Sequence, residues 1–201
     1  MVTMQFPDAA KLEEVIADRR AKGLDKPDEV WDGTYVVMPN PGNEHQKFVL
    51  RIGRACEDIA PASSVVLPGC NVSDREDDWT ENYRVPDVAV FLPGNAAVDR
   101  GSHYLGGPDL AVEVISRGDR TKEKFAFYAK VGVRELVLVE RDPWLVTVYR
   151  IVHGTFEPDS SATPGRGGAA SRILPMTWSL TLANGDRPQL ILTSGGQTWR
   201  A

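Results

Sequence analysis

Cysteine is nearly absent from this chain of 201 residues, which contains only Cys56 and Cys70. The two residues form no Cys-x-x-Cys pair, so neither a zinc site nor a disulfide framework is expected. Free thiols of this kind are typical of proteins in a reducing cytoplasm, and we predict a cytoplasmic location.

Long hydrophobic runs and surplus positive charge are missing as well. The N-terminal segment has no apolar core like that of a signal peptide, and no run approaches the length of a membrane span. We therefore predict no membrane association. The formal net charge of −5 argues against a protein that coats nucleic acid through a general basic surface. It argues less against a nuclease, because a bound metal ion can offset phosphate charge locally.

Two common catalytic motifs are also missing. The sequence has no glycine-rich phosphate loop, and neither Ser102 nor Ser116 has the strand–turn–helix context of a nucleophilic serine. His103 and His153 belong to no recognisable pattern. Any catalytic chemistry is therefore expected from acids, from a lysine or from the remaining histidine, His45.

Hydrophobic residues make up 42% of the chain, which is enough for one well-buried core, and we predict a single domain over residues 1–201. Apolar periodicity predicts a short helix at 9–22 and a longer helix at 44–59, with Asn43 as the N-cap of the second. Between them, an Asp-Gly turn within 30–38 predicts a hairpin.

Strands and a helix alternate in the second half of the chain. Apolar segments at 85–92, 110–115 and 136–139 predict three strands. The last two show almost no alternation, as in strands that are covered on both faces. Residues 121–131 predict a helix between them that ends at Gly132, which completes a βαβ unit.

The C-terminal third gives weaker signals. Residues 146–149 alternate and are expected to form a hairpin strand at the edge of the sheet. The segment 157–171 is rich in Gly, Ser, Ala and Pro and predicts a mobile loop, whereas 173–175 and 178–182 predict a late strand pair. The expected fold class is α/β, with a mixed central sheet flanked by helices and an added N-terminal helix and hairpin.

Two acidic residues lie where a carboxylate is energetically unfavourable. Asp87 begins an apolar strand, and Glu113 lies in the middle of the hydrophobic segment 110–115. A buried carboxylate without a partner costs several kcal/mol or becomes neutral, so each acid needs a compensating group. A cation or a catalytic task would account for both acids. The alternatives are a buried ion pair of Glu113 with Arg134 and ordinary turn chemistry at Asp87.

The helix between these strands carries an inward-facing lysine. Lys124 shares the apolar stripe of Phe127 and Tyr128, whereas Lys122 points away from it. An inward lysine either extends past the packing to solvent or pairs with a buried acid. The acids within its reach are those of the adjoining strands, so the helical spacing selects Lys124 over Lys122 as their partner.

The first long helix offers two more candidates. His45 lies on the same face as Phe48 and Ile52, and Glu44 lies at the edge of that face. A single histidine on an apolar face is more often a buried packing residue than a ligand, so packing is the alternative for His45.

These segments resemble the family of putative restriction endonucleases that is widespread in bacteria and belongs to the PD-(D/E)XK nuclease superfamily. The similarity lies around the two acids and along the intervening helix, and it extends to the hairpin, the start of the first long helix and a late segment. The matching segments are 85–90, 112–116, 119–121, 123–136, Trp31-Asp32-Gly33, Met38-Pro39, Glu44-His45-Gln46 and 171–175. The resemblance covers about residues 28–182.

One residue departs from the superfamily pattern. The lysine that would follow the glutamate by two positions on the same strand is Ile115 in this chain. In this family the lysine has moved to the following helix, where Lys124 is the matching position. The resemblance implies that Asp87 and Glu113, with a backbone carbonyl near Val114, bind Mg²⁺ or Mn²⁺. Lys124 would orient or deprotonate a metal-bound water, or offset charge in the transition state.

The implied function is a metal-dependent DNA endonuclease in which Arg117, Arg120 and Lys122 contact the DNA backbone. Glu44 and His45 would support the metal ligands or add one. A homodimer is expected, because cutting both strands normally requires two sites. Two alternatives remain open: a catalytically inactive nuclease-fold module with a binding or regulatory role, and an unrelated hydrolase of small phosphoesters. The absent strand lysine and the acidic charge favour the inactive module, whereas the retained acids and the inward-facing lysine favour the nuclease.

Overall fold

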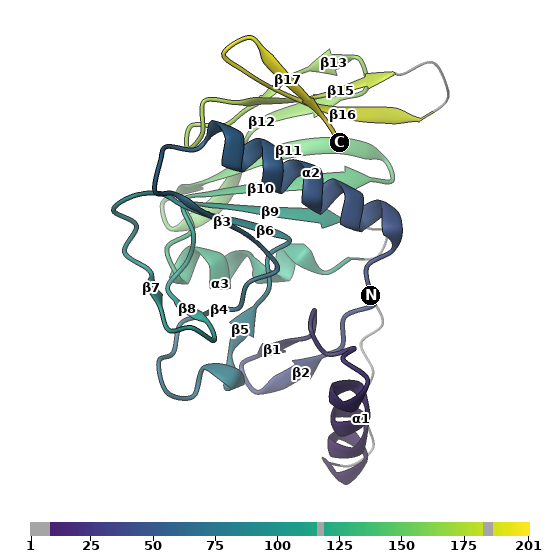
Figure 1. The fold of residues 1–201 in the computed structure, drawn as a ribbon, viewed down its shortest axis with the longest axis vertical. Coiled ribbons are helices and arrows are strands. Elements are labelled where there is room, and N and C mark those ends of the chain that lie inside the picture. The colour runs from purple at the N-terminus through teal and green to yellow at the C-terminus, as the bar shows by residue number, and fades with distance from the viewer. Residues whose placement is uncertain (1–8, 116–118, 183–186) are drawn as a thin grey trace.

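The computed structural model describes residues 9–115, 119–182 and 187–201, which Figure 1 shows as a ribbon. A seven-stranded sheet forms the centre of the fold, in the order β13-β12-β11-β10-β9-β6-β3. Strands β9 and β10 run parallel, and the other neighbours are antiparallel. The strands are Val65–Pro68 (β3), Val88–Phe91 (β6), Leu110–Ile115 (β9), Glu135–Arg141 (β10), Trp144–Val152 (β11), Thr155–Thr163 (β12) and Arg166–Gly167 (β13).

Helices cover the two faces of this sheet (Figure 1). Helix α2 (Asn43–Ile59) packs its buried side chains against inward valines of β6, β9 and β10. Helix α3 (Phe125–Lys130) lies on the other face, where its aromatic residues belong to one cluster with Ala111 and Leu138. Side chains alternate along β9, so Glu113 lies on the α3 face together with Ala111.

Two smaller sheets adjoin the central one. A six-stranded sheet lies on the α3 side in the order β2-β1-β5-β4-β8-β7, and a four-stranded sheet, β14-β15-β16-β17, shares the hydrophobic core of α2. The strands of the first are Glu29–Trp31 (β1), Thr34–Val36 (β2), Val72–Ser73 (β4), Tyr83–Arg84 (β5), Val98–Asp99 (β7) and Tyr104–Leu105 (β8). Those of the second are Ala169–Ala170 (β14), Thr177–Leu182 (β15), Pro188–Ser194 (β16) and Gln197–Arg200 (β17).

The predicted N-terminal helix and hairpin are confirmed. The helix forms as α1 (Ala9–Ala21), and β1 pairs with β2 around Asp32 and Gly33. These two turn residues have φ angles of 46° and 79°, as a two-residue hairpin turn with left-handed residues requires. Arg19 of α1 donates a 2.6 Å hydrogen bond from Nε to Asp28 Oδ2, which attaches the helix to the hairpin.

The βαβ unit is also confirmed, because the parallel strands β9 and β10 are joined through a helical segment. That segment is not one continuous helix over 121–131. A 3₁₀ turn, η2 (Thr121–Lys124), precedes α3, and a second 3₁₀ turn, η1 (Trp79–Glu81), lies before β5. Gly132 follows α3 with a φ of 90°, which agrees with its predicted role in ending the helix.

Asn43 does not cap α2. The N-cap residue is Gly42, which has no side chain to cap with, and Asn43 is the first residue of the helix. Gln46, which could have completed a capping box, donates instead to the carbonyl oxygen of Pro41 at 3.1 Å.

The prediction of a mobile loop at 157–171 is wrong, because β12, β13 and β14 occupy most of that segment. Within β12 only Phe156 and Ala162 are buried, so polar side chains can face solvent while the backbone pairs with β11. The same pairing means that β11 is not an edge strand. The late strand at 178–182 is present in β15, but its partners are β14 and β16 rather than 173–175.

Candidate active site

Asp87 and Glu113 come together from neighbouring strands. Asp87 directly precedes β6 and Glu113 lies in β9, where Val88 pairs with Val112. Continuing this antiparallel register by one residue places Asp87 opposite Glu113 on the same face of the sheet. Asp87 Oδ2 accepts a 2.7 Å hydrogen bond from the backbone N–H of Val114, which fixes the carboxylate against β9.

Glu113 is 5% exposed, and one of its oxygens receives two donors. Oε1 accepts hydrogen bonds from Lys124 Nζ at 3.0 Å and from the Tyr128 hydroxyl at 2.6 Å. Within the described part of the chain, no donor binds Oε2. Burial raises the pKa of Glu113 above its ordinary value; Lys124 opposes this rise and the nearby Asp87 adds to it.

Lys124 lies on the inward side of its helical segment, as its spacing predicts. It is 1% exposed, whereas the neighbouring Lys122 and Glu123 are exposed. Its Nζ lies 2.8 Å from Glu29 Oε1 and 3.0 Å from Glu113 Oε1. Burial lowers the pKa of Lys124, but the charges of Glu113 and Glu29 outweigh burial and hold the pKa above its usual value. The ammonium is therefore kept charged between two carboxylates.

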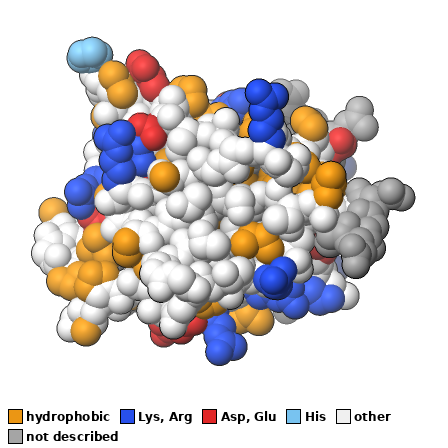
Figure 2. Space-filling model, turned by 90° about the horizontal axis from the view of Figure 1, so that it is seen from above, with side chains coloured by type: hydrophobic (Ala, Val, Ile, Leu, Met, Phe, Trp, Pro, Cys, Tyr) orange, Lys and Arg blue, Asp and Glu red, His pale blue; other side chains and the backbone are white. Residues whose placement is uncertain are grey.

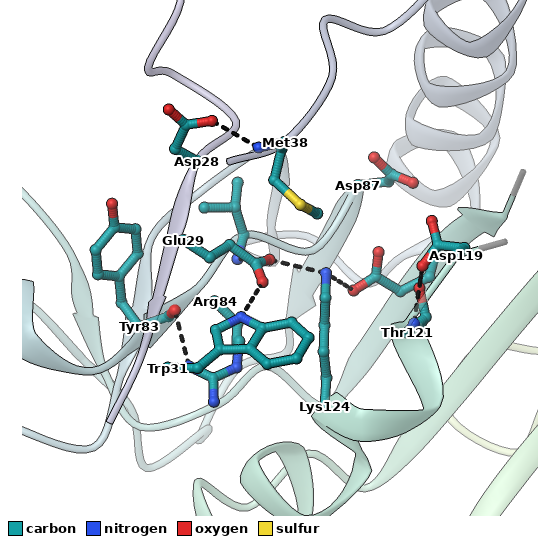
Figure 3. Close-up of polar contacts among 12 residues, drawn as sticks. Asp28, Glu29, Trp31, Met38, Tyr83, Arg84, Asp87, Asp119, Thr121 and Lys124 are labelled. Atoms are coloured by element: carbon teal, nitrogen blue, oxygen red, sulfur yellow. Dashed lines mark hydrogen bonds and ion pairs between the residues drawn. The ribbon is translucent and has the colours of Figure 1, made fainter. Parts of the chain in front are cut away.

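Glu29, which no sequence pattern singled out, completes this group (Figure 3). It is fully buried at the start of β1. Its Oε1 accepts a 2.9 Å hydrogen bond from Val85 N–H, and its Oε2 accepts one of 2.6 Å from Trp31 Nε1. A signal was present in the sequence, because alternation along the hairpin strand places Glu29 and Trp31 on one face. An acid that faces inward beside an aromatic residue requires a partner, as Glu113 does.

His45 and Glu44 reach the same region from the first turn of α2. His45 Nε2 lies 2.9 Å from Asp87 Oδ1, and the His45 side chain is 18% exposed. Glu44 forms ion pairs with Arg141, at 3.0 Å, and with Arg187. Both candidates therefore lie beside the acids.

The contacts differ from the alternatives raised for these residues chiefly in the partners: Glu113 does lie in a buried ion pair, but with Lys124. Arg134 Nη1 binds Asp109 Oδ1 at 2.9 Å and is not the partner of Glu113. Asp87 binds groups on α2 and β9 rather than its own turn. His45 contacts a carboxylate at the molecular surface and is not a simple packing residue.

A cavity of about 840 Å³ opens over this group of side chains. Part of its wall is the segment 38–46, which leads from the hairpin into the first turn of α2. The polar residues around it are well suited to an anionic substrate with a bound cation. They include Lys26, Glu44, His45, Asp87, Glu113, Asp119, Lys124 and Arg141.

The predicted DNA-contacting residues are less well placed. Arg117 lies outside the described residues. Arg120 donates to Glu123 at 2.6 Å, and its guanidinium lies 5.1 Å from the centre of the Trp31 ring. Lys122 is exposed, and neither it nor Arg120 is among the described residues that line the cavity. The face seen in Figure 2, above the four-stranded sheet, carries scattered side chains of both signs and no large basic area.

The donor set fits a hard divalent cation that keeps part of its water. Among the described residues, no three His, Cys, Asp or Glu side chains are grouped so as to hold an ion by themselves. Mg²⁺ typically uses only one or two carboxylates together with waters and substrate phosphate. Asp87 and Glu113 supply two carboxylates on one face, and their mutual repulsion would be relieved by a cation.

A mixed sheet, with acids on adjacent strands and a lysine on the following helical segment, defines a nuclease-like α/β protein. A family model described as putative restriction endonuclease (Uma2) matches residues 19–183, and the chain belongs to this family. The match confirms the family resemblance seen in the sequence.

One similar solved structure is a putative nuclease from Anabaena variabilis, with 19% sequence identity and a TM-score of 0.51. The similarity covers 62% of this chain and 73% of that one, and it supports the predicted fold class. No curated protein matches the chain. None of the helices within the described ranges is sufficiently long and apolar to cross a membrane.

Proposed function

We propose that this chain is a metal-dependent DNA endonuclease that hydrolyses phosphodiester bonds at the cavity. Membership of the putative restriction endonuclease family supports a nuclease-like function. The observation that carries the proposal is the convergence of Asp87, Glu113 and Lys124, which come from three elements and line one cavity.

Asp87 and Glu113, with a backbone carbonyl near Val114, are the proposed ligands of Mg²⁺ or Mn²⁺. Such an ion would lower the pKa of a bound water and stabilise negative charge on the phosphodiester. The chain contributes fixed ligand positions: His45 and a backbone N–H hold Asp87, while Tyr128 holds Glu113. Ligands that are held before substrate binds need little reorganisation during the reaction.

Lys124 is proposed to act as a cation rather than as a base. The carboxylates of Glu29 and Glu113 hold its pKa above the usual value, so the side chain stays protonated. A protonated lysine can donate a hydrogen bond to the attacking water or offset charge on the phosphate, but it cannot accept a proton. Of the roles that the resemblance implies for this lysine, the contacts favour these two.

DNA would reach the cavity past the open first turn of α2, where Glu44 and His45 support the site. Arg117, Arg120 and Lys122 are the proposed contacts with the DNA backbone, and the exposed ammonium of Lys122 needs no rearrangement to make one. A homodimer is part of the proposal, because cutting both DNA strands normally requires two sites. The proposed location is the cytoplasm.

The test is plasmid cleavage by the purified protein with Mg²⁺, with Mn²⁺ and with EDTA. Wild-type protein should nick or linearise the plasmid only with metal, and Asp87→Asn, Glu113→Gln and Lys124→Met should abolish cleavage. Matched controls are Asp109→Asn, a buried acid that does not line the cavity, and Lys130→Met, an exposed lysine on α3. Both should retain activity if their folding is intact.

The outcomes separate the candidate functions. Metal-dependent cleavage that the three site variants lose, and the controls keep, supports the endonuclease. Hydrolysis of small phosphoesters without DNA cleavage would identify a different hydrolase. Absence of any hydrolysis, with DNA or protein binding intact, would identify a catalytically inactive module.

A further inference from the structure

Glu29 is a fully buried acid on a strand of three residues, and both of its oxygens are occupied. Oε2 accepts the indole N–H of Trp31, and Oε1 accepts both the backbone N–H of Val85 and the ammonium of Lys124. A carboxylate bound on both oxygens has one orientation. Two of its three donors are Trp31 of the hairpin and Val85, the residue after β5, so the carboxylate is fixed independently of Lys124.

Holding the hairpin in place is the task of a different acid, the adjacent Asp28. Asp28 is 1% exposed and accepts hydrogen bonds from Arg19, the Tyr35 hydroxyl and the backbone N–H of Met38. Asp28 directly precedes β1 and its side chain contacts Arg19 of α1, whereas the Glu29 side chain contacts Lys124 in the site. Asp28 therefore attaches the hairpin to α1, whereas Glu29 contacts the site.

Lys124, the partner of Glu29 in the site, has a flexible side chain, and contact with a fixed carboxylate would restrict where its ammonium lies. A lysine side chain has four rotatable bonds and a compact charge, so one carboxylate alone does not define where its ammonium lies. Lys124 Nζ is held by two carboxylates from different sheets, at 2.8 Å from Glu29 and 3.0 Å from Glu113. Figure 3 shows the extended lysine reaching Glu29, with Trp31 close to the same carboxylate.

We propose that Glu29 is a positioning residue that fixes the Lys124 ammonium beside Glu113. The inference rests on the proposed nuclease function, in which Lys124 acts on the attacking water or on the phosphate. Glu29 is not among the described residues that line the cavity, and it acts through the lysine.

The activity test compares Glu29→Gln with Asp28→Asn, which makes the same chemical change in the adjacent buried acid. Glu29→Gln should lower kcat roughly tenfold to a hundredfold, as the loss of residues that support a site typically does. KM should change by less than about threefold, since substrate does not contact Glu29. Asp28→Asn should leave kcat within about twofold under conditions in which both variants are folded.

A second readout follows Lys124 directly and needs no activity. In protein labelled with ¹⁵N-lysine, a buried, ion-paired ammonium exchanges slowly with water and gives its own resonance, which Lys124→Met identifies by its loss. Glu29→Gln should shift this resonance and accelerate its exchange, whereas Asp28→Asn should leave it unchanged. If Glu29→Gln does not fold, Glu29→Asp, which withdraws the carboxylate by one carbon, should produce a smaller change of the same kind.

Two results would overturn the proposal. One is a Glu29 variant with wild-type kcat and an unchanged Lys124 resonance. The other is an Asp28→Asn variant that reproduces both changes, because the effect would then belong to the hairpin as a whole. Wild-type protein that cleaves no DNA would contradict the proposed function, but the resonance comparison would still decide whether Glu29 positions Lys124.

Discussion

The hydroxyl of Tyr128 lies 2.6 Å from Glu113 Oε1, so a tyrosine from the short helix α3 orients a carboxylate on the neighbouring strand β9. Lys124 donates to the same oxygen at 3.0 Å. Because both donors use Oε1, the other oxygen of Glu113 is the one available to a ligand. This division holds the buried acid firmly and leaves its second oxygen for the proposed ion.

Replacing Tyr128 with Phe should therefore weaken the fold as well as the site. The ring keeps its packing, but Glu113 loses a hydrogen bond, and we expect the free energy of unfolding to fall by about 1–2 kcal/mol. Urea denaturation measures this change. The control is Tyr149→Phe, whose hydroxyl makes no hydrogen bond within the described residues and which should change stability by less than about 0.5 kcal/mol. Equal effects of the two variants would contradict the account.

Lys124→Met tests the buried charges. Removing the ammonium leaves Glu29 and Glu113 buried without their shared cation, and breaking a buried ion pair in this way typically costs about 3–5 kcal/mol. A triple variant that adds Glu29→Gln and Glu113→Gln to Lys124→Met removes the two unpaired charges. It should recover part of the lost free energy of unfolding. Denaturation of the single and triple variants gives both values. A triple variant no more stable than Lys124→Met would show that lost packing, rather than unpaired charge, is the cause.

Cys56 gives a prediction for the dependence of stability on pH. Burial raises the pKa of this thiol to about 12 from its ordinary 9.0, so the folded protein keeps a proton that the unfolded chain loses between these values. The resulting stabilisation is complete below pH 9 and is lost as pH rises toward 12, by at most about 1.4 kcal/mol per pH unit. The free energy of unfolding of Cys56→Ala, measured from pH 9 to 11, should fall less steeply than that of the wild type. Parallel curves would contradict this explanation.

His45→Ala should weaken metal binding without unfolding the protein. His45 Nε2 holds Asp87 Oδ1 at 2.9 Å, and loss of a group that orients a metal ligand typically lowers affinity roughly tenfold to a hundredfold. Titration calorimetry with Mn²⁺ measures the affinity. Lys47→Ala, an exposed neighbour on the same helix that does not line the cavity, is the control and should bind Mn²⁺ like the wild type. An unchanged affinity in His45→Ala would remove His45 from the site.

Sequence patterns were sufficient to predict the side-chain directions that bring Asp87, Glu113 and Lys124 together. Alternation along a strand and the spacing of a helix are local properties, so they can be read without knowing the tertiary structure. Glu113 and Lys124 are only eleven positions apart in the chain, and the βαβ connection keeps them adjacent. The family match adds support for the overall fold.

Features of two kinds escaped prediction: a buried acid with a distant partner, and strands whose composition does not indicate a strand. Glu29 and Lys124 are 95 residues apart, and no local pattern shows that a hairpin acid will meet this lysine. The strand β12 has an exposed, polar face, so its composition indicates a loop until its pairing with β11 is known. The strands β16 and β17 were also missed, although each pairs with the strand before it in the chain, β16 with β15 and β17 with β16.

The most direct test is a crystal structure of the protein soaked with Mn²⁺, with the ion located by its anomalous signal. We expect an anomalous peak within coordination distance of both Asp87 and Glu113, on the side of Glu113 away from Tyr128. Crystals of Glu113→Gln should show no peak there. If saturating Mn²⁺ leaves these two carboxylates without an ion, or binds only elsewhere, the proposed metal site is wrong.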